Sequence, residues 1–354
     1  MLLLLVWYFL NYLWGCRENE RIKILFLKEF EGLFREQFAH VGPGCVSGMD
    51  GNGGWGNGSS LDEVGEKEAH NGEEKKGLVM HKDSNSSFQL WASGRRHVPR
   101  GMAITLDLQK RHDLFTKLWE RFFPSEDVIT LEAGLNPEEV APFVLALSRR
   151  LHHRSLHLTT PDIFNYTTLL LLPVLLPALD TAHFVVYADN DAVVPLVLPP
   201  ALTRVLEEHK PWFERIHVSD QNTTPVGGHP FLPPVILRAR FLVPTNEADM
   251  HTHLRPLLSL VFELLDHVAG GKVRLSEAAR RRSKEVRAVI EAKKLMELQK
   301  AHQQEREWKK REKQRREQEA YARLTPEQKR RKEEKDAKKK RHEEAKRWAR
   351  THMS

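Results

Sequence analysis

The chain has 354 residues, with 55 Lys/Arg and 48 Asp/Glu and a net charge of +7. The charge is unevenly distributed, because residues 272–354 hold 30 Lys/Arg against 15 Asp/Glu, a net charge of +15, and residues 1–271 carry −8. Only two cysteines occur, Cys16 and Cys45, which excludes a disulfide framework and a cysteine-based zinc site. The composition predicts a near-neutral folded part joined to a basic arm.

The first 14 residues are apolar except for Asn11 and include Trp and Tyr, which favour a membrane interface. A full span needs about 20 residues, so residues 1–15 are predicted to be part of a transmembrane helix that begins upstream. The alternative is a helix buried in the core of a soluble protein. The residues predicted to contact the membrane are Leu2, Leu3, Leu4, Leu5, Val6, Trp7, Tyr8, Phe9, Leu10, Tyr12, Leu13 and Trp14.

Two further segments precede the folded region. Residues 16–41 are predicted to form a juxtamembrane amphipathic helix, because Ile22, Phe26, Phe30 and Phe34 recur on one helical face. Residues 42–87 hold 11 of the 20 glycines and are predicted to be a disordered linker.

Residues 88–269 are predicted to form a globular domain. Alternating and apolar runs predict strands at 88–91, 102–108, 128–131, 183–187, 215–219 and 235–243. Helices are predicted at 114–122, 202–210 and 254–268. A further helix is predicted to start at Asn136 and to carry Val140, Phe143, Val144 and Leu147. This order of strands and helices implies an α/β or α+β layer fold.

The sequence offers little chemistry. No nucleophile, base and orienting group share a motif, and no phosphate-binding loop appears, so we expect no enzyme, no catalytic residue, no metal and no cofactor. Asp189 and Asp191 flank Asn190 and could hold a divalent cation. An exposed acidic turn is the commoner meaning of such a triplet.

The basic arm is predicted to be one charged helix from Ser276 to Leu324, rather than a coiled coil, because apolar residues almost vanish after Leu298. A second helix is predicted to restart at Thr325. The arm's excess of cations favours binding to a phosphate backbone without sequence readout. The predicted binding residues are Arg280, Arg281, Arg282, Lys284, Arg287, Lys309, Lys310, Arg311, Arg330, Arg331, Lys332, Lys338, Lys339, Lys340 and Arg341.

Several stretches in order along the chain resemble one family. They are the apolar start with FAHVG at 38–42, LWASGR at 90–95, QKRHDL at 109–114, FVLA at 143–146, IHVSDQ at 216–221 and VRLS at 273–276. These stretches are similar to the calumin family, the coiled-coil-domain subunits of the PAT complex and of the multipass translocon.

The resemblance implies a single-pass protein of the endoplasmic-reticulum membrane with its globular domain and C-terminus in the cytosol. It implies an intramembrane chaperone for nascent multipass membrane proteins, with a small membrane partner, Asterix, the Sec61 translocon and the ribosome as further partners. The family's acidic lumenal segment, linked to calcium binding, has no counterpart in this sequence. A soluble ribosome- or RNA-associated factor and a charged-helix scaffold are the alternatives.

Overall fold

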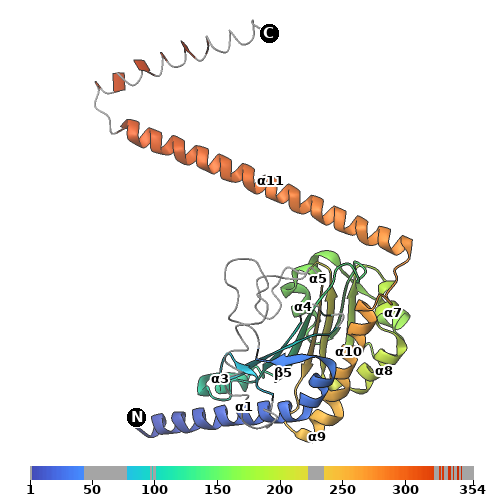
Figure 1. The fold of residues 1–354 in the computed structure, drawn as a ribbon. Helices are drawn as coiled ribbons and strands as arrows, with labels where there is room; N and C mark the ends of the chain where they lie inside the picture. The colour runs from blue at the N-terminus through green and yellow to red at the C-terminus, as the bar shows by residue number, and fades with distance from the viewer. Residues whose placement is uncertain are drawn as a thin grey trace, which may run out of the picture. The chain divides into compact units, whose positions relative to one another are not determined.

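The fold is built on a wide antiparallel sheet (Figure 1). The computed structural model describes residues 2–43, 78–95, 98, 101–221 and 235–322, with scattered positions between 327 and 344. Within them ten strands form the sheet, in the order β1-β3-β4-β5-β10-β9-β6-β8-β7, with β2 paired to β3. The strands are β1 (His40–Gly42), β2 (His81–Lys82), β3 (Ser87–Ser93), β4 (Met102–Asp107), β5 (Val128–Leu135), β6 (Val144–Arg149), β7 (Thr168–Leu170), β8 (Phe184–Ala188), β9 (Phe213–Ser219) and β10 (Val235–Leu242).

Helices cover the two faces of the sheet unequally. One face carries the main core, where α1 (Leu2–Gln37), α7 (Val193–Val197), α8 (Pro200–Glu208) and α10 (Arg255–Ala269) contribute buried side chains. Figure 1 shows α7, α8 and α10 on one side of the strands. A smaller cluster joins β6 and β8 to α4 (His153–Thr159) and α5 (Pro161–Tyr166). The remaining helices are α3 (Leu114–Glu120), α6 (Leu172–Leu175), α9 (Glu247–Asp249) and α11 (Glu277–Ala322), with a 3-10 turn at Lys210–Trp212 and a π turn at Met250–Leu254.

Helix α1 joins the apolar N-terminus to the core without a break. It crosses residue 15, where the sequence had suggested a change from membrane helix to juxtamembrane helix. The predicted amphipathic face is confirmed, since Ile22, Phe26, Phe30 and Phe34 are all fully buried. The second half of α1 is therefore a core element that packs with the sheet and α10.

The prediction of a helix that starts at Asn136 is wrong, because residues 144–149 form strand β6, which lies between β9 and β8. Val144, Leu145, Ala146 and Leu147 are all buried, since helices cover both faces of the sheet here. A short apolar run of this kind fits a doubly buried strand as well as a helix. Pro142 also interrupts the start of a helix.

The other predicted strands and helices of the folded region are confirmed. The predicted disordered linker is wrong over residues 78–87, because Leu78 and Met80 pack into the core and β2 pairs with β3. Strands β9 and β10 pair directly, with Ala239 opposite Ile216, and α10 follows them as expected. Helix α11 spans 46 residues, and Ser276 caps it by accepting a hydrogen bond from the Ala279 amide at 3.2 Å. The predicted mixed α/β architecture with a long C-terminal helix is thus confirmed. Most of the predicted linker, residues 44–77, and the start of the second tail helix at Thr325 lie outside the described residues.

Candidate functional site

The described residues contain no group of three or more His, Cys, Asp or Glu side chains that could hold a metal ion. The Asp189–Asn190–Asp191 turn is not the exposed acidic turn that its sequence suggests. The Asp189 side chain is 1% exposed, and Asn190 is also buried. Only Asp191 lies at the surface. The turn instead contacts the first turns of α11.

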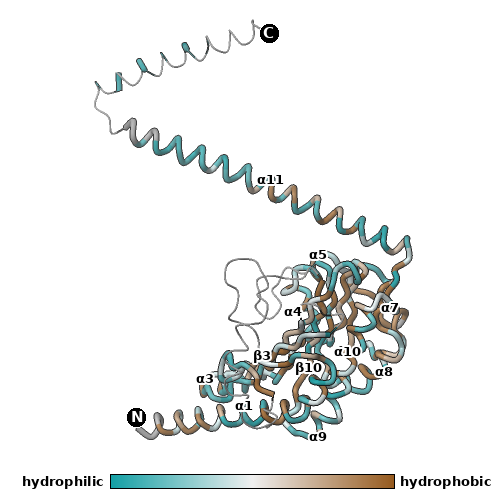
Figure 2. The backbone as a smooth tube through the Cα atoms, in the orientation of Figure 1, coloured by the Kyte–Doolittle hydropathy of each residue, from teal (hydrophilic) through white to brown (hydrophobic). Residues whose placement is uncertain are grey.

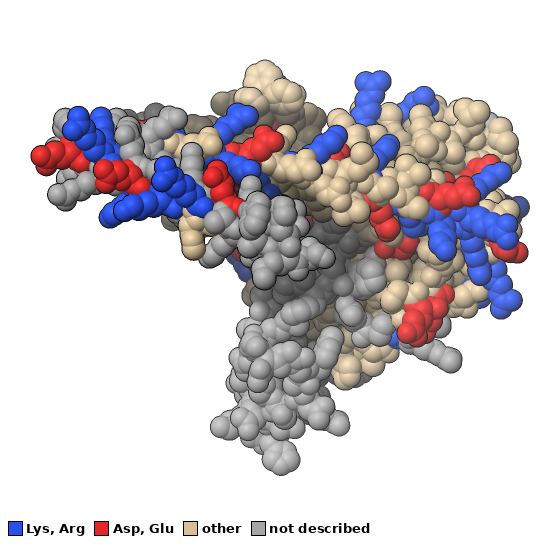
Figure 3. Space-filling view, turned by 90° about the horizontal axis from the view of Figure 1, so that it is seen from above, with Lys and Arg blue, Asp and Glu red and all other residues tan. Residues whose placement is uncertain are grey.

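The basic side chains predicted to bind RNA differ in their surroundings. Arg280, Arg281, Arg282 and Lys284 are exposed on the first turns of α11. Farther along, Lys309 pairs with Glu305 at 2.6 Å and Arg311 with Glu307 at 3.8 Å, while Lys310 is exposed. Beyond α11, Arg330, Lys338 and Arg341 of the predicted set are described and exposed. Arg331, Lys332, Lys339 and Lys340 lie outside the described residues. On the face seen in Figure 3, Lys and Arg are interspersed with Asp and Glu.

Arg287 is the exception among these cations, because it is held against the folded domain. Its guanidinium lies 3.3 Å from Asp189 and 2.9 Å from Asp220. Ser283, one turn earlier, donates a hydrogen bond to Asp189 at 2.9 Å. One turn earlier still, the Ala279 carbonyl accepts a hydrogen bond from the Asn190 side chain at 3.3 Å.

Ala279, Ser283 and Arg287 thus form one face at i, i+4 and i+8, which we call the root of α11. Ala279 and Ser283 are buried, and Val273 and Leu275 are buried just before the helix. Burial raises the pKa of the Asp189 carboxyl above its ordinary value, although the Arg287 charge opposes that shift. Sequence reasoning missed the root because Ser283 and Asp189 are 94 positions apart. The recurrence of small and polar residues every fourth position was its only sequence signal.

The first half of α1 exposes a run of large apolar side chains. Trp7, Phe9, Leu10 and Trp14 are each more than half exposed, and Val6, Tyr8 and Leu13 are 40–47% exposed. Figure 2 shows this half as largely hydrophobic, whereas α11 is largely hydrophilic. Leu2, Leu3, Leu4 and Leu5 belong to the same helix. Across the described residues, no helix reaches the length and apolar character needed to span a bilayer.

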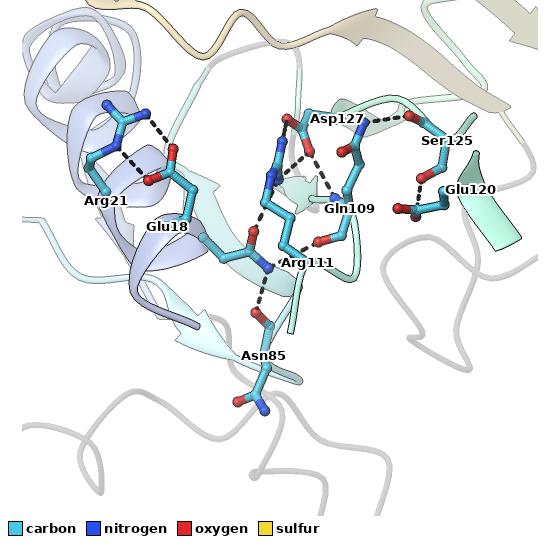
Figure 4. Close-up of polar contacts among 9 residues, drawn as sticks. Glu18, Arg21, Asn85, Gln109, Arg111, Glu120, Ser125 and Asp127 are labelled. Atoms are coloured by element: carbon cyan, nitrogen blue, oxygen red, sulfur yellow. Dashed lines mark hydrogen bonds and ion pairs between the residues drawn. The ribbon is translucent and has the colours of Figure 1, made fainter. Parts of the chain in front are cut away.

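A polar lock fixes α1 to the segment that leads into α3. The Asn19 amide group donates hydrogen bonds to the Asn85 and Gln109 carbonyls, both at 3.0 Å, and its oxygen accepts one from Arg111 at 3.0 Å. Arg111 also makes two bonds to the Asp127 carboxylate, at 2.9 and 2.5 Å. Figure 4 shows the Arg111 guanidinium directed at the Asp127 carboxylate. Paired carboxylate and guanidinium groups hold each other in a fixed orientation, so the lock sets the angle at which α1 leaves the domain.

Gly15 allows α1 to approach this segment closely. A Cβ atom at Gly15 would lie 2.3 Å from the Arg111 carbonyl carbon and 2.3 Å from the His112 nitrogen. Asn11, one turn earlier, donates a hydrogen bond to the Arg111 carbonyl at 3.5 Å. Asn11, Gly15 and Asn19 therefore share the face of α1 that contacts residues 109–112.

We expect Gly15→Ala to destabilise the folded chain by roughly 1–3 kcal/mol, because the added methyl group meets backbone atoms that cannot move aside cheaply. Gly32 is a matched control in the same helix, since a Cβ there has nothing within 4 Å. Gly32→Ala should stabilise by up to about 1 kcal/mol through helix propensity. Thermal unfolding of the two purified variants would measure the difference. Equal melting temperatures would show that the close contact at Gly15 is absent in solution.

Comparison with known proteins assigns the chain to a family. The family model of the PAT complex subunit CCDC47 matches residues 1–342, which covers α1, the sheet, α11 and most of the tail. The chain belongs to this family. The sequence-based assignment is thereby confirmed. The description of the family names a subunit of the PAT complex.

Two distant relatives also match the chain. One is the PAT complex subunit CCDC47 of Danio rerio, 24% identical over 300 residues, which cover 80% of this chain and 55% of the relative. Another is an uncharacterized Arabidopsis thaliana protein, 23% identical over 282 residues, which cover 77% of this chain and 50% of the relative. The chain therefore spans about half the length of these relatives.

A solved structure was also matched, that of the mycobacterial trehalose monomycolate transport factor A. It is 12% identical, with a TM-score of 0.27, and the match covers 53% of this chain and 76% of that one. At this level of similarity it carries no argument about fold or function.

Proposed function

We propose that the chain is a non-enzymatic subunit of an endoplasmic-reticulum intramembrane chaperone that assists multipass membrane proteins at the ribosome-bound translocon. The observation that carries the proposal is the family match, which includes both the folded unit and the basic helix. In this proposal the partners are the small membrane protein Asterix, the Sec61 translocon, nascent multipass proteins and the ribosome with its RNA.

The proposal assigns a role to each part of the chain. The first 15 residues belong to a single-pass membrane helix, a role supported by the exposed apolar side chains of α1. The sheet domain and the C-terminus are cytosolic. The tail contacts ribosomal RNA through its exposed cations, a role supported by the net charge of +15 over residues 272–354. Arg287 is excluded from that contact because it is paired with Asp189 and Asp220.

Membrane fractionation of cells that express the tagged full chain tests this proposal. We expect the chain to remain in the membrane pellet after carbonate extraction, and we expect the Asterix partner and Sec61 to co-purify with it from detergent-solubilised membranes. A membrane-rich fraction should also contain ribosomes until ribonuclease or high salt removes them.

Two other outcomes would contradict the proposal. Release of the chain by carbonate, with continued ribosome pelleting, would identify a soluble ribosome-associated factor. Association that survives both ribonuclease and high salt would favour a charged-helix scaffold, because RNA contacts weaken as salt rises.

A further inference from the structure

Helix α3 presents apolar side chains that the fold does not use. Phe115, Leu118, Trp119, Phe122 and Phe123, on α3 or in the turn after it, are 62–76% exposed. No residue of α3 is buried. A cluster of exposed aromatic residues is rarely left facing water on a soluble domain and marks a surface that contacts something else.

The chemistry of this segment suits the interface of a bilayer. Exposed cations, Lys110, Lys117 and Arg121, are interleaved with the aromatic side chains. Trp and Phe favour the headgroup and upper acyl region, while Lys and Arg reach toward anionic headgroups. At the start of α3 the Asp113 carboxylate caps the helix, because it accepts hydrogen bonds from the Phe115 amide and the Thr116 hydroxyl. Glu120 likewise accepts a hydrogen bond from the Ser125 hydroxyl, and Glu126 is exposed, so apolar and basic side chains outnumber the acidic ones on this segment.

Helix α3 lies beside α1, the helix that is proposed to enter the membrane, and this position favours a bilayer as the surface that α3 contacts. The Lys117 ammonium lies 4.6 Å from the centre of the Trp14 ring and 3.4 Å from the Asn11 oxygen. Figure 1 shows α3 beside the N-terminal half of α1. The exposed apolar residues of α3 and those of α1 near Leu10 and Trp14 therefore lie on adjacent helices.

The polar lock determines which part of α1 lies beside the segment that leads into α3. Residues 11–19 of α1 are held against residues 109–112, and only the turns before Asn11 extend free of these contacts. Tyr12 and Trp14 therefore lie at the end of the apolar run, next to the segment that leads into α3. Trp and Tyr gather at this boundary when an apolar helix enters a membrane.

We propose that α3 is a second membrane-binding element, which lies in the headgroup region of the same bilayer that α1 enters. The ligand is the surface of a phospholipid bilayer that contains anionic lipid. This inference rests on the proposed membrane role of α1. With α1 inserted and α3 on the surface, the sheet domain is held at two points against the membrane rather than hanging from one helix.

Fluorescent labelling of the full chain in liposomes tests the contact. Cys16 and Cys45 are replaced by Ser, and a polarity-sensitive fluorophore is attached to Phe122→Cys or, as a control, to Leu171→Cys. Leu171 is 76% exposed and lies beside β7, at the opposite edge of the sheet from β1 and β2. The liposomes contain phosphatidylcholine and phosphatidylserine, with nitroxide-labelled lipid as the quencher.

We expect quenching at position 122 to exceed that at position 171 by at least about twofold, because interfacial helices insert their apolar face into the upper acyl region. Equal, weak quenching at both positions in a chain that resists carbonate extraction would overturn the α3 contact while leaving the anchor intact. Release by carbonate would instead overturn the proposed function. A blue shift at position 122 in native microsomes, with no quenching by nitroxide lipid in either membrane, would mean that a protein covers α3 and would also refute the proposal.

Discussion

Replacing the exposed basic clusters of the tail with Gln should reduce ribosome co-sedimentation by roughly 10- to 100-fold at physiological salt, because each neutralised phosphate releases a counterion. The first cluster is Arg280, Arg281, Arg282 and Lys284, and the second is Lys338, Lys339, Lys340 and Arg341. The salt dependence of binding should become shallower as well. Pelleting of purified ribosomes at several salt concentrations measures both effects.

The control for this experiment changes charge in the opposite sense. Replacing Glu277, Glu285, Glu291 and Glu297 with Gln alters the same number of residues on α11 but removes acidic groups. This control should bind at least as well as the parent chain. Gln has nearly the helix propensity of Lys, Arg and Glu, so circular dichroism should show unchanged helicity in both variants. Unchanged ribosome binding after loss of both basic clusters would assign the contact to the folded domain instead.

The second large effect is expected at the root of α11. Arg287→Ala should destabilise the folded unit by about 3–5 kcal/mol, because it leaves the buried Asp189 carboxylate without its counter-charge. The side chains of Arg287, Asp189 and Asp220 are 13%, 1% and 11% exposed. Arg282→Ala, at an exposed position on the same helix, should change stability by less than about 0.5 kcal/mol. Thermal and urea unfolding of the two variants measures this contrast.

The effect of Arg287→Ala should depend on pH. Burial raises the pKa of Asp189 in the folded state, so its protonated form is favoured there, and any stability linked to that proton is lost as pH rises through the folded pKa. Without Arg287 the carboxylate form is penalised further. The stability deficit of Arg287→Ala should therefore shrink as the pH falls toward the Asp189 pKa. A deficit that is constant with pH would indicate lost packing rather than an unpaired carboxylate.

Local patterns in the sequence predicted most of the architecture, whereas contacts between distant segments were missed. The apolar face of α10 repeats along one helix, so periodicity revealed it, whereas α11 was predicted from its long run of charged, helix-forming residues. Strand β6 was misassigned because residues buried on both faces show no alternation.

The root of α11 and the close approach at Gly15 depend on partners far away in the sequence. Gly15 packs against the backbone of Arg111, and Ser283 donates a hydrogen bond to Asp189. A glycine in a helix, or a serine one turn from an arginine, does not identify such partners. The basic clusters were visible from composition alone, but only the geometry separates Arg287, which anchors the helix, from the exposed cations around it.

Because α1 is one continuous helix, its first turns and its last turns move together as a rigid rod. At 1.5 Å per residue its 36 residues reach about 54 Å, and Phe34 in its last turns packs edge-on against Phe262 of α10. Any tilt imposed on the first turns must be matched by rotation of the whole sheet domain, since no hinge between Leu2 and Gln37 can absorb it. If the first turns lie in a membrane as proposed, a change in membrane thickness or a client that contacts them would therefore rotate the sheet domain.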